Sequence, residues 1–193
     1  MWPWEHLAAG YVLYSVYVRA RYDEPPGGTE AFLLALGTQL PDLIDKPLAW
    51  TFGVLPSGTS VAHSVFVAAV FVPTVVLLAR RAGVPRWGSA LAFGHVSHLP
   101  GDVLYPFLTD GDLPFSILLW PVVVGPASEP EGFIFEFQTL FAAFVDFLAT
   151  PRGQFYLVLE LVLLSTALLV WILDGAPVLS QMVSSVRPRR TSD

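Results

Sequence analysis

The sequence predicts an all-α integral membrane helical bundle of about five to six hydrophobic helices, some of them short or re-entrant. Hydrophobic residues make up 54% of the 193 positions and charged residues only 13%, whereas a soluble domain carries about 25% charged residues. Apolar segments alternate with loops that are rich in proline, glycine and charge, such as "DEPPGG" at 23–28. Tryptophans lie at the segment ends, as interfacial anchors do.

The apolar segments set the expected order of the helices. They cover residues 6–20, 30–45, 61–79, 86–105, 132–149 and 154–173. A complete membrane crossing takes about 20 residues, and only 61–79 and 154–173 reach that length cleanly. We therefore expect tilted or partly submerged helices in the first two segments, and a partly submerged or interfacial helix at 132–149. Residues 1–174 are expected to form one domain, and 175–193 a polar, disordered tail.

Charge and cysteine content exclude several classes of function. The net charge of −6 offers no broad basic surface, so we expect no nucleic acid partner. The chain has no cysteine, which excludes disulfides, thiolate metal ligands and a cysteine nucleophile.

Arginines mark one side of the predicted bundle. Arg19 and Arg21 close the first segment, and Arg80, Arg81 and Arg86 fill the loop between the third and fourth. The positive-inside rule places these ends in the cytoplasm of a multi-pass cell membrane protein, with the N-terminus outside. Lys46 is an exception, because it falls at an outer end.

Histidines and aspartates mark the opposite side. Four segments bring such residues to their predicted extracytoplasmic ends, namely His6, Asp42 with Asp45, His63, and His98 with Asp102. On a helix, positions 95, 98 and 102 fall within an arc of roughly 60°. Pro100 is expected to kink or end that helix.

A mixed histidine and aspartate set suits a divalent metal such as zinc, manganese, iron or nickel. Without cysteine it is more typical of a catalytic than of a structural site. We expect His6, Asp42, His63, His98 and Asp102 to be metal ligands. Asp42, Asp45 and Asp102 are the candidates for a general base or for a carboxylate that orients a ligand histidine. His95 is expected to pack or to support its neighbours, and each residue alone also has a structural explanation, such as an interfacial histidine for His6.

The short motifs together resemble a known family. A histidine near the N-terminus, "PDLID" at 41–45, "AHS" at 62–64, "SHLPGD" at 97–102 and "LLWP" at 118–121 resemble the membrane-bound metal-dependent hydrolases of the YdjM type. The resemblance covers residues 6–121 and implies site roles for His6, Asp42, His63, His98 and Asp102, with Asp45 close behind. Ala62 stands where the family has threonine.

The resemblance and the cluster together predict a membrane hydrolase that uses a metal-activated water. Zinc is the expected metal, with manganese or iron as alternatives. A more distant similarity to zinc-dependent phospholipase C enzymes suggests an ester or phosphodiester, of a lipid or another amphiphile, as substrate, with membrane lipids as partners. Two alternatives stay open: a transporter or ion-conducting protein that uses the same cluster, and a non-catalytic membrane scaffold.

Overall fold

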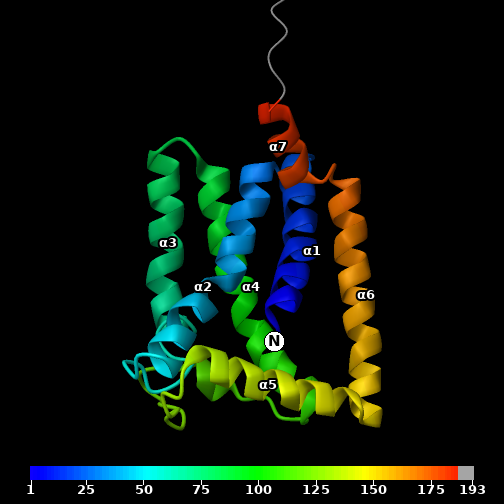
Figure 1. Ribbon diagram of the computed structural model, residues 1–193. Coiled ribbons are helices and arrows are strands. Elements are labelled where there is room, and N and C mark those ends of the chain that lie inside the picture. The colour runs from blue at the N-terminus through cyan, green and yellow to red at the C-terminus, as the bar shows by residue number, and fades with distance from the viewer. Residues whose placement is uncertain (187–193) are drawn as a thin grey trace, which may run out of the picture.

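The computed structural model describes residues 1–186, and the last part of the expected tail, 187–193, lies outside the described residues. The described chain is helical and contains no strand, which confirms the all-α prediction. The elements in order are α1 (Pro3–Tyr22), α2 (Gly28–Trp50), α3 (Val65–Arg81), α4 (Pro85–Thr109), the 3-10 helix η1 (Phe115–Leu118), α5 (Phe133–Leu148), α6 (Pro151–Leu173) and α7 (Pro177–Val186). Helices α1 to α4 and α6 form an upright bundle, α5 crosses its end, and two short elements complete the described chain (Figure 1).

The first two helices are longer than the sequence pattern predicted. Helix α1 has 20 residues and α2 has 23, and at about 1.5 Å per residue either length matches the roughly 30 Å of a bilayer core. The polar stretch that ended the predicted second helix is part of α2, because Thr38, Asp42 and Asp45 are buried inside the bundle. Figure 1 shows α2 changing direction in its C-terminal half, which contains Pro41 and Pro47.

Helix α4 continues through Pro100 as far as Thr109, so Pro100 does not end it. Helix α3, in contrast, starts later than the predicted residue 61. The Ser64 side chain caps this helix by accepting hydrogen bonds from the backbone of Phe66 and Val67. His63 therefore lies in the turn just before α3.

Close packing of α2 against α4 places the two helices that carry most of the candidate ligands. A Cβ atom at Gly94 would collide with the carbonyl oxygen of Leu34, and one at Gly37 would collide with the carbonyl oxygen of Leu91. Because both positions are glycine, the two backbones can approach each other directly. This contact holds α2 and α4 side by side near their middles, just before the residues of the site.

The last three helices complete the ends of the bundle. Helix α5 lies across one end, roughly perpendicular to the others, and α6 returns the chain to the other end (Figure 1). The segment from 175 was expected to be disordered, but its residues 177–186 form α7. Val178 explains the difference, because it packs against the core cluster around Tyr11 and Leu34.

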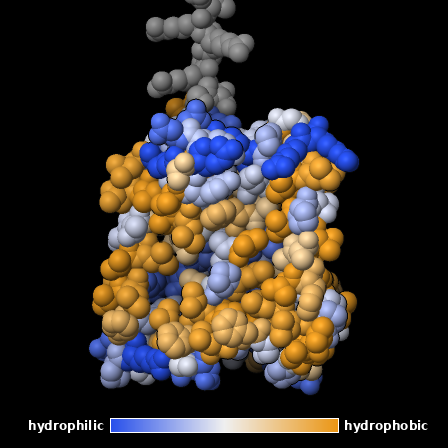
Figure 2. Space-filling view, turned by 180° about the vertical axis from the view of Figure 1, so that it is seen from behind, coloured by the Kyte–Doolittle hydropathy of each residue, from blue (hydrophilic) through white to orange (hydrophobic). Residues whose placement is uncertain are grey.

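The surface of the bundle is strongly apolar. Figure 2 shows a broad hydrophobic band between two hydrophilic ends. Within the described residues, one helical stretch, Pro151–Val183, is long and apolar enough to cross a membrane by length and composition alone. Side chains of this stretch such as Val158, Leu161 and Leu168 are exposed, as expected for a helix that faces lipid.

Candidate metal centre

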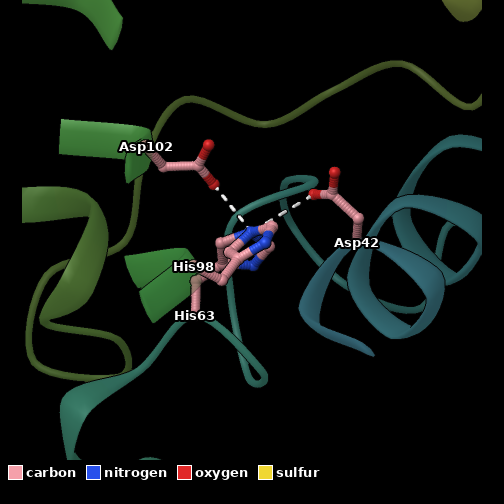
Figure 3. Close-up of side chains that lie close together, drawn as sticks. All are labelled: Asp42, His63, His98 and Asp102. Carbon is pink, nitrogen blue, oxygen red and sulfur yellow. Dashed lines mark hydrogen bonds and ion pairs between the residues drawn. The ribbon is translucent and has the colours of Figure 1, made fainter. Parts of the chain in front are cut away.

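Four acidic and histidine side chains meet at the end of the bundle where α2 ends and α3 begins. They are Asp42 from α2, His63 from the turn before α3, and His98 and Asp102 from one face of α4 (Figure 3). Each offers one ligand atom, and these atoms all lie within 4.8 Å of one another. His63 and His98 are completely buried, Asp42 is buried, and Asp102 is nearly so.

The ligand atoms face a common point. The Nε2 atoms of His63 and His98 lie 3.1 Å apart. Asp102 Oδ2 lies 3.1 Å from the Nε2 of His63 and 3.0 Å from that of His98. Asp42 Oδ1 approaches from the other side, at 3.4 Å from His63 Nε2 and 3.8 Å from His98 Nε2, as Figure 3 shows. This is a tetrad of nitrogen and oxygen donors of the kind that a divalent metal takes.

One atom of this group is poorly satisfied by the protein alone. Asp42 Oδ1 is buried and makes no short hydrogen bond among the described residues, since the nearest imidazole nitrogen, His63 Nε2, lies 3.4 Å away. A buried carboxylate oxygen without a well-formed hydrogen bond is costly. A cation between Asp42 Oδ1 and the two imidazoles would satisfy it, so the residues present fit a metal ion.

Each imidazole of the tetrad has a hydrogen-bond partner at its Nδ1 atom, on the side of the ring away from the site. His63 Nδ1 lies 2.8 Å from Asp45 Oδ2, and His98 Nδ1 lies 2.7 Å from the carbonyl oxygen of Thr38. A hydrogen bond donated by Nδ1 leaves Nε2 free to bind a metal, and such partners set the orientation of the ring. The Nε2 atoms of both rings are therefore the ones presented to the site.

Asp45 organises the turn that carries His63. Its carboxylate is fully buried and accepts backbone hydrogen bonds from Ser60, Ala62 and His63, at 2.8, 3.0 and 3.2 Å. Together with His63 Nδ1, these three backbone amides make four donors, and they occupy both oxygens of Asp45. Asp45 is thus placed as a support for His63 and is not one of the four ligand residues.

His6 lies beside the tetrad and not within it. Its Nε2 is 3.0 Å from Asp102 Oδ1, the oxygen of that carboxylate that faces away from His63 and His98. Its ring stacks on the ring of His98, with centroids 3.7 Å apart. The structure therefore brings together four of the five predicted ligands and places the fifth in contact with two of them.

His95 stays outside the site, as the sequence analysis expected. It is buried, its ring contacts Phe71 with centroids 4.8 Å apart, and neither ring nitrogen has a hydrogen-bond partner in the described chain.

Sequence reasoning missed three polar contributors to the site, namely Lys46, Ser64 and the amino group of Met1. The amino group of Met1 donates a hydrogen bond of 2.6 Å to Asp102 Oδ1. Lys46 Nζ lies 2.5 Å from Asp42 Oδ2, one helical turn away. The spacing of four residues between Asp42 and Lys46 was a signal for this ion pair. Ser64 donates a hydrogen bond of 2.6 Å to the carbonyl oxygen of Trp120, which ties the "AHS" and "LLWP" motifs to each other.

Surrounding carboxylates change the protonation of His63. Burial disfavours the charged ring, but hydrogen bonds to Asp102, Asp42 and Asp45 outweigh burial and raise the pKa of His63 to about 10. Without a metal, the excess negative charge of the site is therefore balanced by a proton on His63. A bound cation would take the place of that proton.

A cavity of about 490 Å³ leads to the tetrad. It lies between α2, α5 and the start of α1, and Asp42 and Lys46 are part of its wall. Most of the remaining wall is apolar and includes Leu43, Trp50 and Phe137. The site is thus reached through an apolar opening at the end of the bundle.

Of the comparisons with known proteins, one finds a match, and it is to a family model. No match is found among curated proteins or among solved structures. A family model described as "YdjM inner membrane protein" matches residues 1–177. This stretch includes the whole tetrad, together with His6, Asp45 and Lys46, and it extends beyond the motifs on which the resemblance rested. The chain therefore belongs to the YdjM inner membrane protein family.

Proposed function

We propose that this protein is a multi-pass membrane hydrolase that uses a divalent metal ion, with zinc as the first choice. The observation that carries the proposal is the convergence of two oriented Nε2 atoms and two carboxylates, whose ligand atoms lie within 4.8 Å of one another. When bound there, a divalent ion would lower the pKa of a water molecule and polarise the bond under attack. Manganese and iron suit the same donors.

The residues divide into distinct roles in this proposal. His63, His98 and Asp102 hold the ion, because their ligand atoms lie closest together. Asp42 is set farther from both imidazoles and borders the cavity. It is therefore the carboxylate best placed to accept a proton from a water that enters with the substrate. Asp45 orients His63.

The cavity supports an amphiphilic substrate, such as an ester or phosphodiester of a lipid. Its apolar wall lies next to the ionic tetrad, so one molecule would need both an apolar part and a polar group to fill it. A lipid can enter such a site from the membrane without crossing water.

Charge at the bundle ends supports an extracytoplasmic site. Arg19, Arg21, Arg80, Arg81 and Arg86 lie at the ends of α1, α3 and α4 that are opposite the tetrad (Figure 1). Only Lys46 and Arg152 of the described basic residues lie at the tetrad end. Single cysteines at Glu131 and Ala82 test the orientation without background labelling, since the chain has no cysteine. A membrane-impermeant reagent applied to intact cells should label position 131 and not position 82, and the reverse pattern would place the site in the cytoplasm.

Hydrolysis itself is tested with the purified protein. We expect the zinc-loaded protein to release product from a labelled phospholipid, and His98→Gln to lose this activity while Arg80→Gln, at the other end of the bundle, keeps it. Equal turnover by wild type and His98→Gln would refute a hydrolase at this site. Zinc uptake into proteoliposomes without hydrolysis would support a transporter instead, and a protein that binds no stoichiometric metal would be a scaffold.

A further inference from the structure

Two cavities of different character meet at Lys46. The apolar cavity described above reaches Lys46 from the side of Ile134 and Phe137 on α5. A second cavity, of about 540 Å³, reaches it from the side of the loops. Most of the wall of this second cavity is apolar, but the wall also contains five hydroxyl or carboxylate side chains, namely Ser57, Thr59, Ser116, Ser128 and Glu136. Lys46, Trp50 and Leu140 belong to the walls of both cavities, so the two lie next to each other.

The wall of the second cavity contains two opposite charges. Lys46 is the only lysine of the chain, and its side chain is 23% exposed while it pairs with Asp42. Glu136 belongs to the same cavity, is part of α5, and has no ion pair among residues 1–186. The second cavity therefore offers a cation next to the tetrad and an unpaired carboxylate.

We propose that the natural ligand is a phospholipid whose headgroup carries a protonated amine. Its acyl chain occupies the apolar cavity, its phosphodiester lies beside Lys46 and the tetrad, and its ammonium group pairs with Glu136. The proposal rests on the proposed function for the position of the phosphodiester at the tetrad. The contacts with Lys46 and Glu136 are separate from metal binding and can be measured without turnover.

Charge complementarity favours this headgroup over other amphiphiles. An uncharged diacylglycerol offers Lys46 no anion besides Asp42, and a phosphoglycerol headgroup leaves Glu136 without a cation. Inorganic phosphate could pair with Lys46 but would leave the apolar cavity unfilled. Each of these molecules therefore serves as a control for one part of the ligand.

The test is a binding measurement on the full-length protein in neutral detergent, with and without zinc. The probes are dioctanoyl phosphatidylethanolamine, dioctanoyl phosphatidylglycerol and dioctanoylglycerol. The variants are Lys46→Gln, Lys46→Arg, Glu136→Gln and Ile134→Trp, which would fill the apolar cavity. Asp146→Asn, on the exposed face of the same helix α5, is the matched control for Glu136→Gln.

Each variant should affect one part of the ligand. We expect Glu136→Gln to weaken binding of phosphatidylethanolamine about tenfold, the effect of one charge-assisted hydrogen bond. Binding of phosphatidylglycerol by this variant should be unchanged. The control variant Asp146→Asn should bind both lipids as the wild type does. Lys46→Gln should weaken the binding of both phospholipids but not that of dioctanoylglycerol, and Lys46→Arg should bind both phospholipids as the wild type does. Ile134→Trp should weaken the binding of all three lipids.

Metal content, measured in every variant, separates this proposal from the proposed function. Lipid selectivity that depends on Lys46 and Glu136, in a protein without stoichiometric metal, would support the proposed phospholipid ligand. The same result would contradict the proposed function as a metal-dependent hydrolase. A metal-loaded protein that binds phosphatidylglycerol as tightly as phosphatidylethanolamine, or whose preference survives Glu136→Gln, would overturn the ligand and leave the metal site standing.

Discussion

Replacing Asp45 with asparagine tests how the site is held without changing any of the four ligand residues. The Asp45 carboxylate receives hydrogen bonds from three backbone amides and lies 2.8 Å from His63 Nδ1. Asparagine has only one oxygen. Ala62 N lies 3.0 Å from each of the two Asp45 oxygens, so in either orientation the new NH₂ group faces the amide N–H of Ala62, donor against donor.

The expected losses follow from these contacts. A buried donor left unsatisfied costs about 1–3 kcal/mol, so the unfolding temperature of Asp45→Asn should fall even without metal. Loss of a partner behind a metal-binding histidine typically lowers metal affinity about 10–100-fold, which corresponds to roughly 1.4–2.8 kcal/mol. We expect the zinc affinity of Asp45→Asn to fall within this range while one ion still binds at saturation.

The assay is a competition between the protein and a chelator of known zinc affinity, combined with a thermal unfolding curve of the metal-free protein. Asp112→Asn, in the exposed loop at the same end of the bundle, is the control and should match wild type in both measurements. A zinc affinity of Asp45→Asn within twofold of wild type would refute the role of Asp45 in orienting His63.

Three further predictions concern ligation, packing and proton release. His98→Gln should abolish stoichiometric zinc binding and His95→Gln should keep it, as measured by elemental analysis; equal zinc content in both would contradict the assignment of the two histidines. Gly94→Ala should lower the unfolding temperature, because its Cβ would collide with the α2 backbone. The control Gly125→Ala should not lower it, because the nearest atom to its Cβ would lie 3.8 Å away. Equal thermal unfolding curves for the two variants would contradict the tight contact of α2 with α4. Since the pKa of His63 is raised to about 10 in the metal-free protein, this ring is protonated at pH 7–8, and zinc binding should release its proton and become tighter as pH rises toward 10. Calorimetry in two buffers of different ionisation enthalpy measures this release, and identical heats would show that His63 carries no proton to lose.

The gathering of the site at one bundle end could be predicted from the sequence, because helix direction alternates from one segment to the next. Once four segments are recognised, the position of Asp42 near the end of one helix and His98 near the end of another already places them together. The spacing of His98 and Asp102 adds a shared helix face. These inferences use only the order of the segments and the geometry of a helix.

The distinction between direct ligands and their partners could not be predicted in the same way. His6 and His63 are both histidines at the same bundle end. A difference of a few ångströms decides that His63 faces His98 Nε2, while His6 contacts the far oxygen of Asp102. Such distances depend on how the helices pack, which sequence spacing does not specify.

Lys46 and the length of α2 are a second feature that could not be predicted from the sequence. Polar residues near the end of a hydrophobic segment were interpreted as the end of the helix, and Lys46 as an exception to the charge pattern. Both belong to a helix that continues past its prolines, because buried partners such as His63 satisfy its polar side chains. Polarity signals a helix end only when the polar groups face water, and at a functional site they do not.

The central claim, a metal ion held by His63, His98 and Asp102 beside the carboxylate of Asp42, is tested most directly by zinc content combined with the zinc X-ray absorption spectrum of the purified protein. We predict one ion per chain and a spectrum with imidazole nitrogen and carboxylate oxygen at about 2.0–2.2 Å, in a protein that has no cysteine to contribute sulfur. Both the content and the imidazole signal should be lost in the double variant His63→Gln/His98→Gln. A wild-type protein without stoichiometric metal, or a double variant that keeps its zinc and the same spectrum, would contradict the account.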